Sequence, residues 1–372
     1  MARYACGQAR GKDWRNATDA CLATIEVPGE GAALGFLYVT DSLAADLGEV
    51  VRRCQEVTGV EHWVGTVGMG VCATAQEYYD EPAVTVMVGA FPAGSFRVFP
   101  TVQDGFTGFD GAHADWLAAH HPQIALVHGD PRNAALPTLI EGLADRVETG
   151  FLVGGLTSSR GAYPQVADGI TEGGLSGVLF GRDVLVRTRL TQGCSPIGPY
   201  REVTEADRNI VVELDGRPAL DVLREDIGEI LSRDLSRIGG YVFAALPVEG
   251  SDTGDYLVRN LVGIDARQGM IAIGDRVRPG GRLMFCRRDG MSAREDLVRT
   301  LERLRQTIPG APRGGIYVSC LGRGASLLGP ASAELRLVAE VLGDFPLVGF
   351  YANGEISHRR LYGYTGVITL FF

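Results

Sequence analysis

The sequence predicts an α/β protein of two related halves with mixed β-sheets and outer helices, and a four-layer αββα arrangement is the preferred packing. Its 372 residues are 45% hydrophobic and 22% charged, as is typical of a folded globular protein. An order of strand, helix, strand and strand occurs three times, and two of these occurrences share short motifs. Duplicated sheets can cover each other's apolar faces, which favours four layers.

The first occurrence begins with an apolar run rich in strand-forming residues at 35–40. Asp41 and Ser42 follow, and both are residue types that cap helices. From Leu43 to Val57 apolar residues recur three or four positions apart, which predicts a helix that ends at Gly59. Two further strands are expected at 62–67 and 83–88.

The same order returns twice. The second occurrence has strands and a helix at 124–127, 136–147, 150–153 and 175–180, and the third has them at 315–320, 332–342, 346–350 and 364–370. Residues 152–158 resemble residues 347–353, and residues 175–179 resemble residues 364–368. We infer an internal structural duplication from these matches.

The segment from 192 to 204 is expected to separate the halves, because its prolines and glycines interrupt strands and helices. This gives domains 1-192 and 193-372. The second domain adds a helix that starts near Pro218 and a helix with a capping box at Ser292 and Glu295. Its additional strands are expected at 209–216, 241–246, 256–264, 269–274 and 281–286.

Charge and composition exclude several classes of partner. The net charge of -10 opposes binding to nucleic acid or to an anionic membrane. No signal core or membrane span is visible, so we expect a cytoplasmic protein. The seven cysteines are far apart and contain no C-x-x-C pair, which favours reduced thiols and no metal site. His120 and His121 lack a second pair of ligands at metal spacing.

Polar clusters in four loops that follow predicted strands provide the candidate ligand site. The candidate ligand-binding residues are Cys194, Ser195, Cys320, Arg323, Asn353, Glu355 and Ser158. A guanidinium such as that of Arg323 can hold a carboxylate, and Glu355 can pair with an amino group. These two side chains with Asn353 suit an amino acid or a similar zwitterion, provided that all three converge on one cavity.

Plainer interpretations stay open at each of these loops. Arg323 suits a structural ion pair equally well. The Asn353-Gly354 pair is typical of an ordinary turn. Cys194 and Cys320 allow a Cys-dependent hydrolase as an alternative, but no neighbouring residue is seen that would activate the thiol of Cys194.

The chain resembles the FIST family, with its N- and C-terminal domains, over nearly its whole length. The matching motifs are residues 192–198, 209–219, 259–264, 320–324, 349–355 and 365–371, with weaker matches at 154–158 and 173–177. The resemblance implies a non-enzymatic sensory protein of signal transduction that binds a small ligand, with amino acids the usual proposal. It also implies a separate signalling partner such as a histidine kinase or cyclase, because the two halves account for all 372 residues.

The resemblance allows one further alternative. Some FIST-like proteins are haem-dependent nitric oxide sensors, so haem is the one cofactor we consider. A haem needs an axial ligand in an apolar pocket. His62, His128 and His358 are candidates, and no motif distinguishes them.

Overall fold

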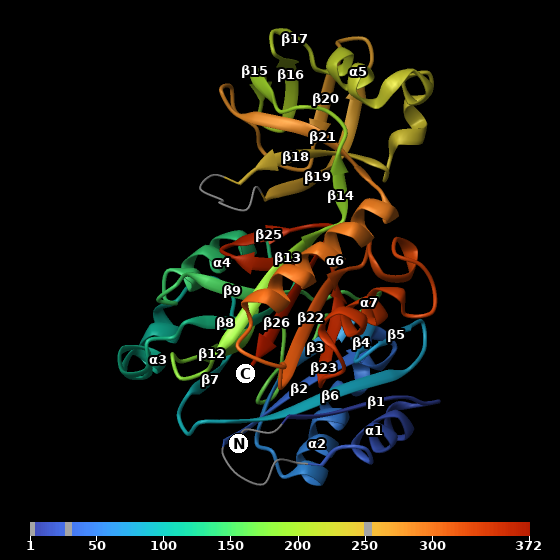
Figure 1. Cartoon of the computed structure of the whole chain (residues 1–372). Helices are drawn as coiled ribbons and strands as arrows, with labels where there is room; N and C mark the ends of the chain where they lie inside the picture. Colours follow the sequence, from blue (N-terminus) through green and yellow to red (C-terminus); the bar gives the residue numbers. More distant parts are fainter. Residues whose placement is uncertain (1–3, 27–31, 249–254) are drawn as a thin grey trace. The chain divides into compact units, whose positions relative to one another are not determined.

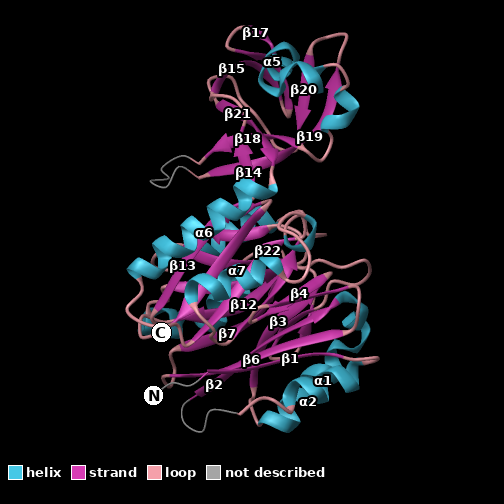
Figure 2. Ribbon diagram, turned by 45° about the vertical axis from the view of Figure 1, so that its right-hand side comes forward, coloured by secondary structure: helices cyan, strands magenta, loops and turns pink. Residues whose placement is uncertain are grey.

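The computed structural model describes residues 4–26, 32–248 and 255–372, and it divides the chain into two compact units (Figure 1). The first unit comprises Met1–Thr191 and Arg294–Phe372, and the second comprises Gln192–Ala293. Both units contain helices and mixed or antiparallel sheets, so the predicted α/β class is confirmed (Figure 2). No helix among the described residues is long and apolar enough to cross a membrane.

Three segments of the first unit share one order of strands and α-helices. The first segment contains β1 (Tyr4–Arg10), α1 (Trp14–Leu22), β2 (Ala32–Thr40), α2 (Leu47–Thr58), β3 (His62–Gly68), the hairpin β4 (Gly70–Ala73) and β5 (Gln76–Tyr79), and β6 (Ala83–Phe91). The second contains β7 (Phe96–Val102), α3 (Thr107–His120), β8 (Ile124–Gly129), α4 (Leu136–Ala144), β9 (Phe151–Leu156), the hairpin β10 (Gln165–Ala167) and β11 (Ile170–Thr171), and β12 (Leu175–Phe180).

The third segment repeats this order with one interruption. It contains β13 (Val186–Gln192), α6 (Gly290–Thr307), β22 (Gly314–Cys320), α7 (Ala333–Leu342), β23 (Leu347–Ala352), the hairpin β24 (Glu355–His358) and β25 (Arg360–Tyr362), and β26 (Thr365–Phe371). The second unit is inserted in the sequence between β13 and α6. The predicted duplication is therefore a triplication in the described part of the first unit.

Each segment builds a six-stranded sheet but gives its hairpin to another sheet. The sheet orders are β1-β6-β2-β3-β10-β11 for the first sheet, β7-β12-β8-β9-β24-β25 for the second and β13-β26-β22-β23-β4-β5 for the third. In each sheet the two central strands joined by a helix run parallel. The hairpin of the first segment thus completes the third sheet, that of the third completes the second, and that of the second completes the first.

One apolar core lies between the inner faces of the three sheets. It includes Phe36 and Leu34 of the first sheet, Leu126 and Phe180 of the second, and Phe350 of the third. The outer face of each sheet is covered by its own pair of helices, α1 and α2, α3 and α4, or α6 and α7. The αββα order expected for two sheets is present in each pair, and a third sheet with its helices closes the same core.

A glycine at one position of the second parallel strand marks all three segments. A Cβ atom at Gly65, Gly154 or Gly349 would lie 1.7, 1.9 and 1.7 Å from the carbonyl oxygen of the residue opposite in the neighbouring parallel strand. Only glycine permits this close backbone approach. The internal motif match of residues 152–158 with residues 347–353 includes this glycine in the second and third segments. It did not include the first segment, because the residues that follow Gly65 differ.

The second unit is a closed antiparallel barrel. Its elements are β14 (Cys194–Pro196), β15 (Arg201–Asp207), β16 (Ile210–Leu214), β17 (Arg217–Pro218), α5 (Ala219–Ser232), β18 (Val242–Pro247), β19 (Tyr256–Asp265), β20 (Met270–Ile273) and β21 (Arg282–Arg288). The strands pair in the order β15-β16-β20-β19-β18-β21, and β21 pairs back onto β15. Leu220 and Leu223 of α5 belong to the apolar core of this unit.

Several expected element boundaries need correction. Asp41–Asp46 form a 3₁₀ helix, and α2 begins only at Leu47. Helix α6 begins at Gly290, where Asp289 accepts hydrogen bonds from the Ser292 hydroxyl and from the Met291 N–H, so Ser292 does not start a capping box. The segment 192–204 contains β14 and the start of β15, because Pro196 ends β14 and Pro199 lies in the connection between the two strands. The domain limits 1-192 and 193-372 stay a prediction, whereas the compact units are discontinuous in sequence.

Candidate functional site

The seven candidate residues are divided between the two units. Cys194 and Ser195 lie in the second unit. Cys194 is buried, and its carbonyl oxygen accepts a 2.6 Å hydrogen bond from the Tyr256 hydroxyl. The other five, Ser158, Cys320, Arg323, Asn353 and Glu355, lie in the first unit. The geometry of the candidate site therefore rests on these five.

Ser158 and Asn353 differ in how their side chains are held. The Ser158 hydroxyl donates to the Tyr351 carbonyl oxygen at 2.5 Å and accepts from the Met69 N–H at 2.9 Å, so it links the loop after β9 to strand β23 and to the β3–β4 connection. Asn353 is exposed, and its backbone N–H donates to the Leu156 carbonyl oxygen at 3.0 Å. Asn353 lies in the connection between β23 and β24, whereas Arg323 and Glu355 are buried, so the convergence of the three side chains stays a prediction.

Arg323 is held by a buried carboxylate. Its side chain is fully buried, and Nε donates to Glu334 Oε1 at 2.8 Å. Glu334 is on α7 and also accepts from the Tyr317 hydroxyl, the Ser319 hydroxyl and the Gly324 N–H, at 2.7 to 3.1 Å. The structural ion pair considered from the sequence is thus present. Nη1 and Nη2 of Arg323 are buried and make no hydrogen bond within the described residues.

Glu355, the first residue of β24, is fully buried and only half satisfied. Its Oε2 accepts from the Thr365 N–H at 3.0 Å and from the Thr365 hydroxyl at 2.8 Å. Oε1 has no hydrogen-bond partner in the part of the chain that the structure describes. Burial raises the pKa of Glu355 to about 8, although Thr365, Arg323 and Cys320 act in the opposite direction. At neutral pH this carboxyl group is therefore mainly protonated.

Cys320 ends β22 in the same region as Glu355 and Arg323. Burial, with the Glu355 charge next in importance, raises the pKa of its thiol, and the Arg323 charge only partly offsets this. The Gly322 N–H lies 3.4 Å from Sγ. Since a nucleophilic cysteine needs a lowered pKa, this environment opposes the hydrolase interpretation at Cys320.

The strand register defines equivalent positions in the other segments. Glu355 pairs with Gly155, Gln165 pairs with Thr66, and Val71 pairs with Phe350, each on the second parallel strand of its sheet. Glu355, Gln165 and Val71 therefore occupy one position of the exchanged hairpin. The sequence did not indicate this equivalence, since the hairpins share no motif.

At the equivalent position in the first sheet, both polar ends of the side chain have hydrogen-bond partners. Gln165 is buried, its Nε2 donates to the Gly174 carbonyl oxygen at 3.1 Å, and its Oε1 accepts from the Ser176 hydroxyl at 2.5 Å. In the adjoining loop Asp130, at the position of Cys320, accepts from the Gly173 N–H and from Arg132. Of the side chains compared at these positions and in the adjoining loops, only those of Arg323 and Glu355 have buried atoms without a hydrogen-bond partner among the described residues.

Two carboxylates escaped the sequence prediction. Glu334 lies in the first turn of the predicted helix at 332–342, where an acidic residue is unremarkable. Glu77, on the hairpin β4–β5, accepts from the N–H groups of Glu334 and Leu335 at 3.0 and 3.2 Å and so caps α7. Burial and the Glu334 charge raise the pKa of Glu77. No sequence signal joins residues this far apart.

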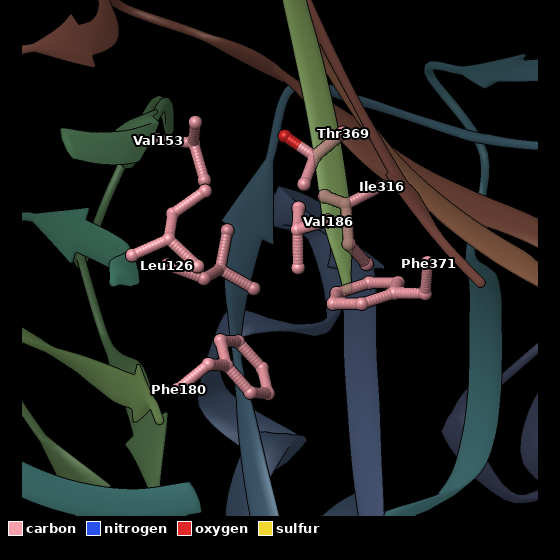
Figure 3. Close-up of a pocket in the computed structure, with 8 residues that line it drawn as sticks. Leu126, Val153, Phe180, Val186, Ile316, Thr369 and Phe371 are labelled. Carbon is pink, nitrogen blue, oxygen red and sulfur yellow. The ribbon is translucent and has the colours of Figure 1, made fainter. Parts of the chain in front are cut away.

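The pocket in Figure 3 lies elsewhere, between the second and third sheets. Its walls are apolar except for one threonine, and it leaves no room for a water-sized molecule. The lining residues are Ile124, Leu126, Val153, Phe180, Val186, Ile316, Thr369 and Phe371. None of the predicted ligand-binding residues lines it.

The same pocket does not fit a haem, because it is too narrow and no histidine lines it. Nδ1 of His62 lies 2.9 Å from the Asp168 carboxylate, at the surface. His128 is fully buried with Nε2 3.2 Å from the Tyr38 hydroxyl, and burial lowers its pKa to about 3. His358 is exposed beside β25.

Comparison with known proteins covers most of the chain. The FIST N domain matches residues 33–217, and the FIST C domain matches residues 219–358. The chain is 34% identical over 359 residues to an uncharacterized protein of Mycobacterium tuberculosis, covering 92% of this chain and 91% of that protein. It is 31% identical over 369 residues to an uncharacterized protein of Mycobacterium bovis, covering 93% and 92%. The resemblance seen in the motifs is therefore confirmed, and the chain belongs to the FIST family.

Proposed function

We propose that this protein is a sensory component of signal transduction that binds a small metabolite with a carboxylate group, such as an amino acid, against Arg323 and Glu355. FIST domains are associated with sensory roles in signal transduction. The observation that carries the proposal is the presence of unpartnered buried atoms, Nη1 and Nη2 of Arg323 and Oε1 of Glu355, in one region of the first unit.

The chemistry of these atoms favours a carboxylate ligand. Glu334 binds Nε of Arg323 and so fixes the guanidinium plane, leaving both terminal nitrogens as donors. A guanidinium binds a carboxylate through two parallel hydrogen bonds, which are stronger than neutral ones. An unpartnered buried polar group costs about 1–3 kcal/mol, so such groups are rare unless they serve a function.

Partly exposed residues lie next to Arg323 and Glu355. Cys320, Leu321, Gly322 and Tyr364 are all half-buried, so surface-accessible residues adjoin the buried pair in sequence and in space. Gly322 lies against the Tyr364 ring, since a Cβ atom on it would be 3.0 Å from that ring. On the proposed function, a ligand enters past these half-buried residues.

Thermal unfolding with a panel of amino acids and short carboxylic acids tests the proposal. A ligand at 100 times its Kd should raise the free energy of unfolding by about 2.7 kcal/mol. Arg323→Gln should abolish the effect, whereas Arg132→Gln, which changes the exposed arginine of the equivalent loop, should preserve it.

Because Arg323→Gln removes the buried partner of Glu334, its fold must be checked by circular dichroism. Arg323→Lys keeps the charge but loses the two parallel donors, so it should fold and bind at least tenfold more weakly. If no compound stabilises the wild-type protein, or if Arg323→Lys binds normally, the proposal is contradicted and the ion pair is structural.

Other interpretations from the sequence have their own tests. A haem-dependent nitric oxide sensor predicts a saturable Soret shift when haem is added to the purified protein. A Cys-dependent hydrolase predicts ester cleavage that Cys194→Ser or Cys320→Ser removes. A histidine kinase or cyclase is the expected signalling partner, and ligand-dependent co-purification with it would support the sensory role.

A further inference from the structure

The hydrogen bonds at Glu355 define what its free oxygen can offer. Both donors of Thr365, its N–H and its hydroxyl, bind Oε2, which leaves Oε1 as the only unpartnered oxygen. The equivalent Gln165 has an acceptor oxygen at one end and a donor nitrogen at the other. A carboxylic acid that is protonated on Oε1 has the same pattern of one acceptor and one donor.

Burial favours this neutral form, and the neighbouring groups that favour ionisation offset it only in part. Arg323 is the positive group that acts on Glu355, and its charge is already matched by Glu334. The other titratable group that acts on Glu355 is the Cys320 thiol, and its raised pKa keeps it neutral. Ionised Glu355 would therefore add an uncompensated buried negative charge, which is costly.

Taking the proposed function as given, we infer that the ligand is a carboxylate anion held between the Arg323 guanidinium and the un-ionised carboxyl group of Glu355, and that it needs no ammonium group. Both protein groups then act as donors, and the two oxygens of the ligand act as acceptors. This differs from the zwitterion expected from the sequence, in which Glu355 had to be ionised to bind an amino group.

The two alternatives predict opposite effects of pH on affinity. If binding requires protonated Glu355, affinity falls as the carboxyl group ionises, by about tenfold from pH 7 to pH 9 for a free-protein pKa of about 8. If Glu355 instead binds an ammonium group, affinity rises over the same range. Acetate is ionised throughout this range, so its own protonation does not disturb the measurement.

The experiment titrates the full chain with acetate, glycine and methylamine at pH 6, 7, 8 and 9, with binding followed by calorimetry. Acetate and glycine should bind with falling affinity above pH 7, and methylamine should not bind. Glu355→Gln keeps the neutral donor and acceptor, so it should bind acetate with an affinity that is constant from pH 7 to pH 9. Glu172→Gln changes an exposed carboxylate of the second segment and should leave the wild-type profile unchanged.

The outcomes separate this inference from the function on which it rests. Binding of methylamine, glycine affinity that rises with pH, or a wild-type acetate profile as flat as that of Glu355→Gln would overturn the inference, while a small-ligand site at Arg323 would stand. Failure of acetate and glycine together with every member of the wider panel would overturn the proposed function as well.

Discussion

The second and third segments of the first unit place a polar side chain at the same point of an exchanged hairpin, in different surroundings. Both the nitrogen and the oxygen of the Gln165 side-chain amide make hydrogen bonds within the protein, whereas Oε1 of Glu355 has no partner among the described residues. The loop arginines differ in the same way, since the Arg132 side chain is 54% exposed and Arg323 is fully buried. Repetition of the backbone therefore fixes where polar groups lie, and individual side chains decide whether they stay available to a ligand.

The largest expected effect tests whether the segments are equivalent at all. Gly349→Ala should prevent folding or destabilise the protein by more than about 3 kcal/mol, because its Cβ atom would lie 1.7 Å from the Tyr317 carbonyl oxygen. Gly154→Ala should be similarly severe. Gly161→Ala, where a Cβ atom would meet nothing within 4 Å, is the control. Urea unfolding measures all three, and a mild effect at either strand glycine would weaken the equivalence.

The two loop arginines should differ strongly in their contribution to stability. Arg323→Gln should lower the free energy of unfolding by about 3–5 kcal/mol, because it leaves Glu334 as a buried charge without its cation. Arg132→Gln should change stability by less than about 1 kcal/mol, as is usual for exposed pairs. Equal losses in chemical denaturation would show that burial does not distinguish the two loops.

Glu355 should make stability depend on pH. Its pKa is 4.5 in a model peptide and about 8 in the folded chain, so between these values the folded state holds one more proton than the unfolded state. Stability should therefore fall as pH rises from 4.5 to 8, by about 4 kcal/mol. Glu355→Gln should remove this contribution, as seen in thermal melts at pH 5 and pH 8. A wild-type curve identical to that of the variant would contradict the raised pKa.

Giving the second segment the residue of the third segment at this one position has the smallest expected effect on stability. Gln165→Glu replaces a donor to the Gly174 carbonyl oxygen by an ionisable group, so it should cost about 1–3 kcal/mol at pH 8. The cost should be smaller at pH 5, where a protonated carboxyl group can still donate. Melts at the two pH values measure this difference, and Gln306→Glu at an exposed position of α6 serves as the control. A cost that does not vary with pH would mean that the position does not favour a neutral side chain.

Much of the local structure could be predicted from the sequence. Strands and helices were found in all three segments, because apolar periodicity and cap residues are local signals. The loops after β22 and β23 were predicted to contribute to a ligand site; Arg323, after β22, and Glu355, the first residue of β24, are both buried. The family resemblance rested on the same loops.

The rest depended on contacts between distant residues. Pairing of Val71 with Phe350 and capping of α7 by Glu77 join parts of the chain that no local pattern relates. The role of Asn353 could not be decided, because a turn residue and a ligand residue look alike in sequence, and its place in the ligand site stays a prediction. The 3₁₀ helix at Asp41–Asp46 was read as the start of α2, since both helix types begin with the same cap residues.

The circular exchange of hairpins has a consequence for biosynthesis. The chain leaves the ribosome from its N-terminus, so β4 and β5 are made long before β23, the strand that receives them. The second sheet likewise waits for β24, which is made long after β9, the strand that receives it. Until then two strand edges lie open to pairing with other chains. A nascent chain that stalls before residue 347 should therefore aggregate, and its rescue belongs to the chaperones that meet it at the ribosome.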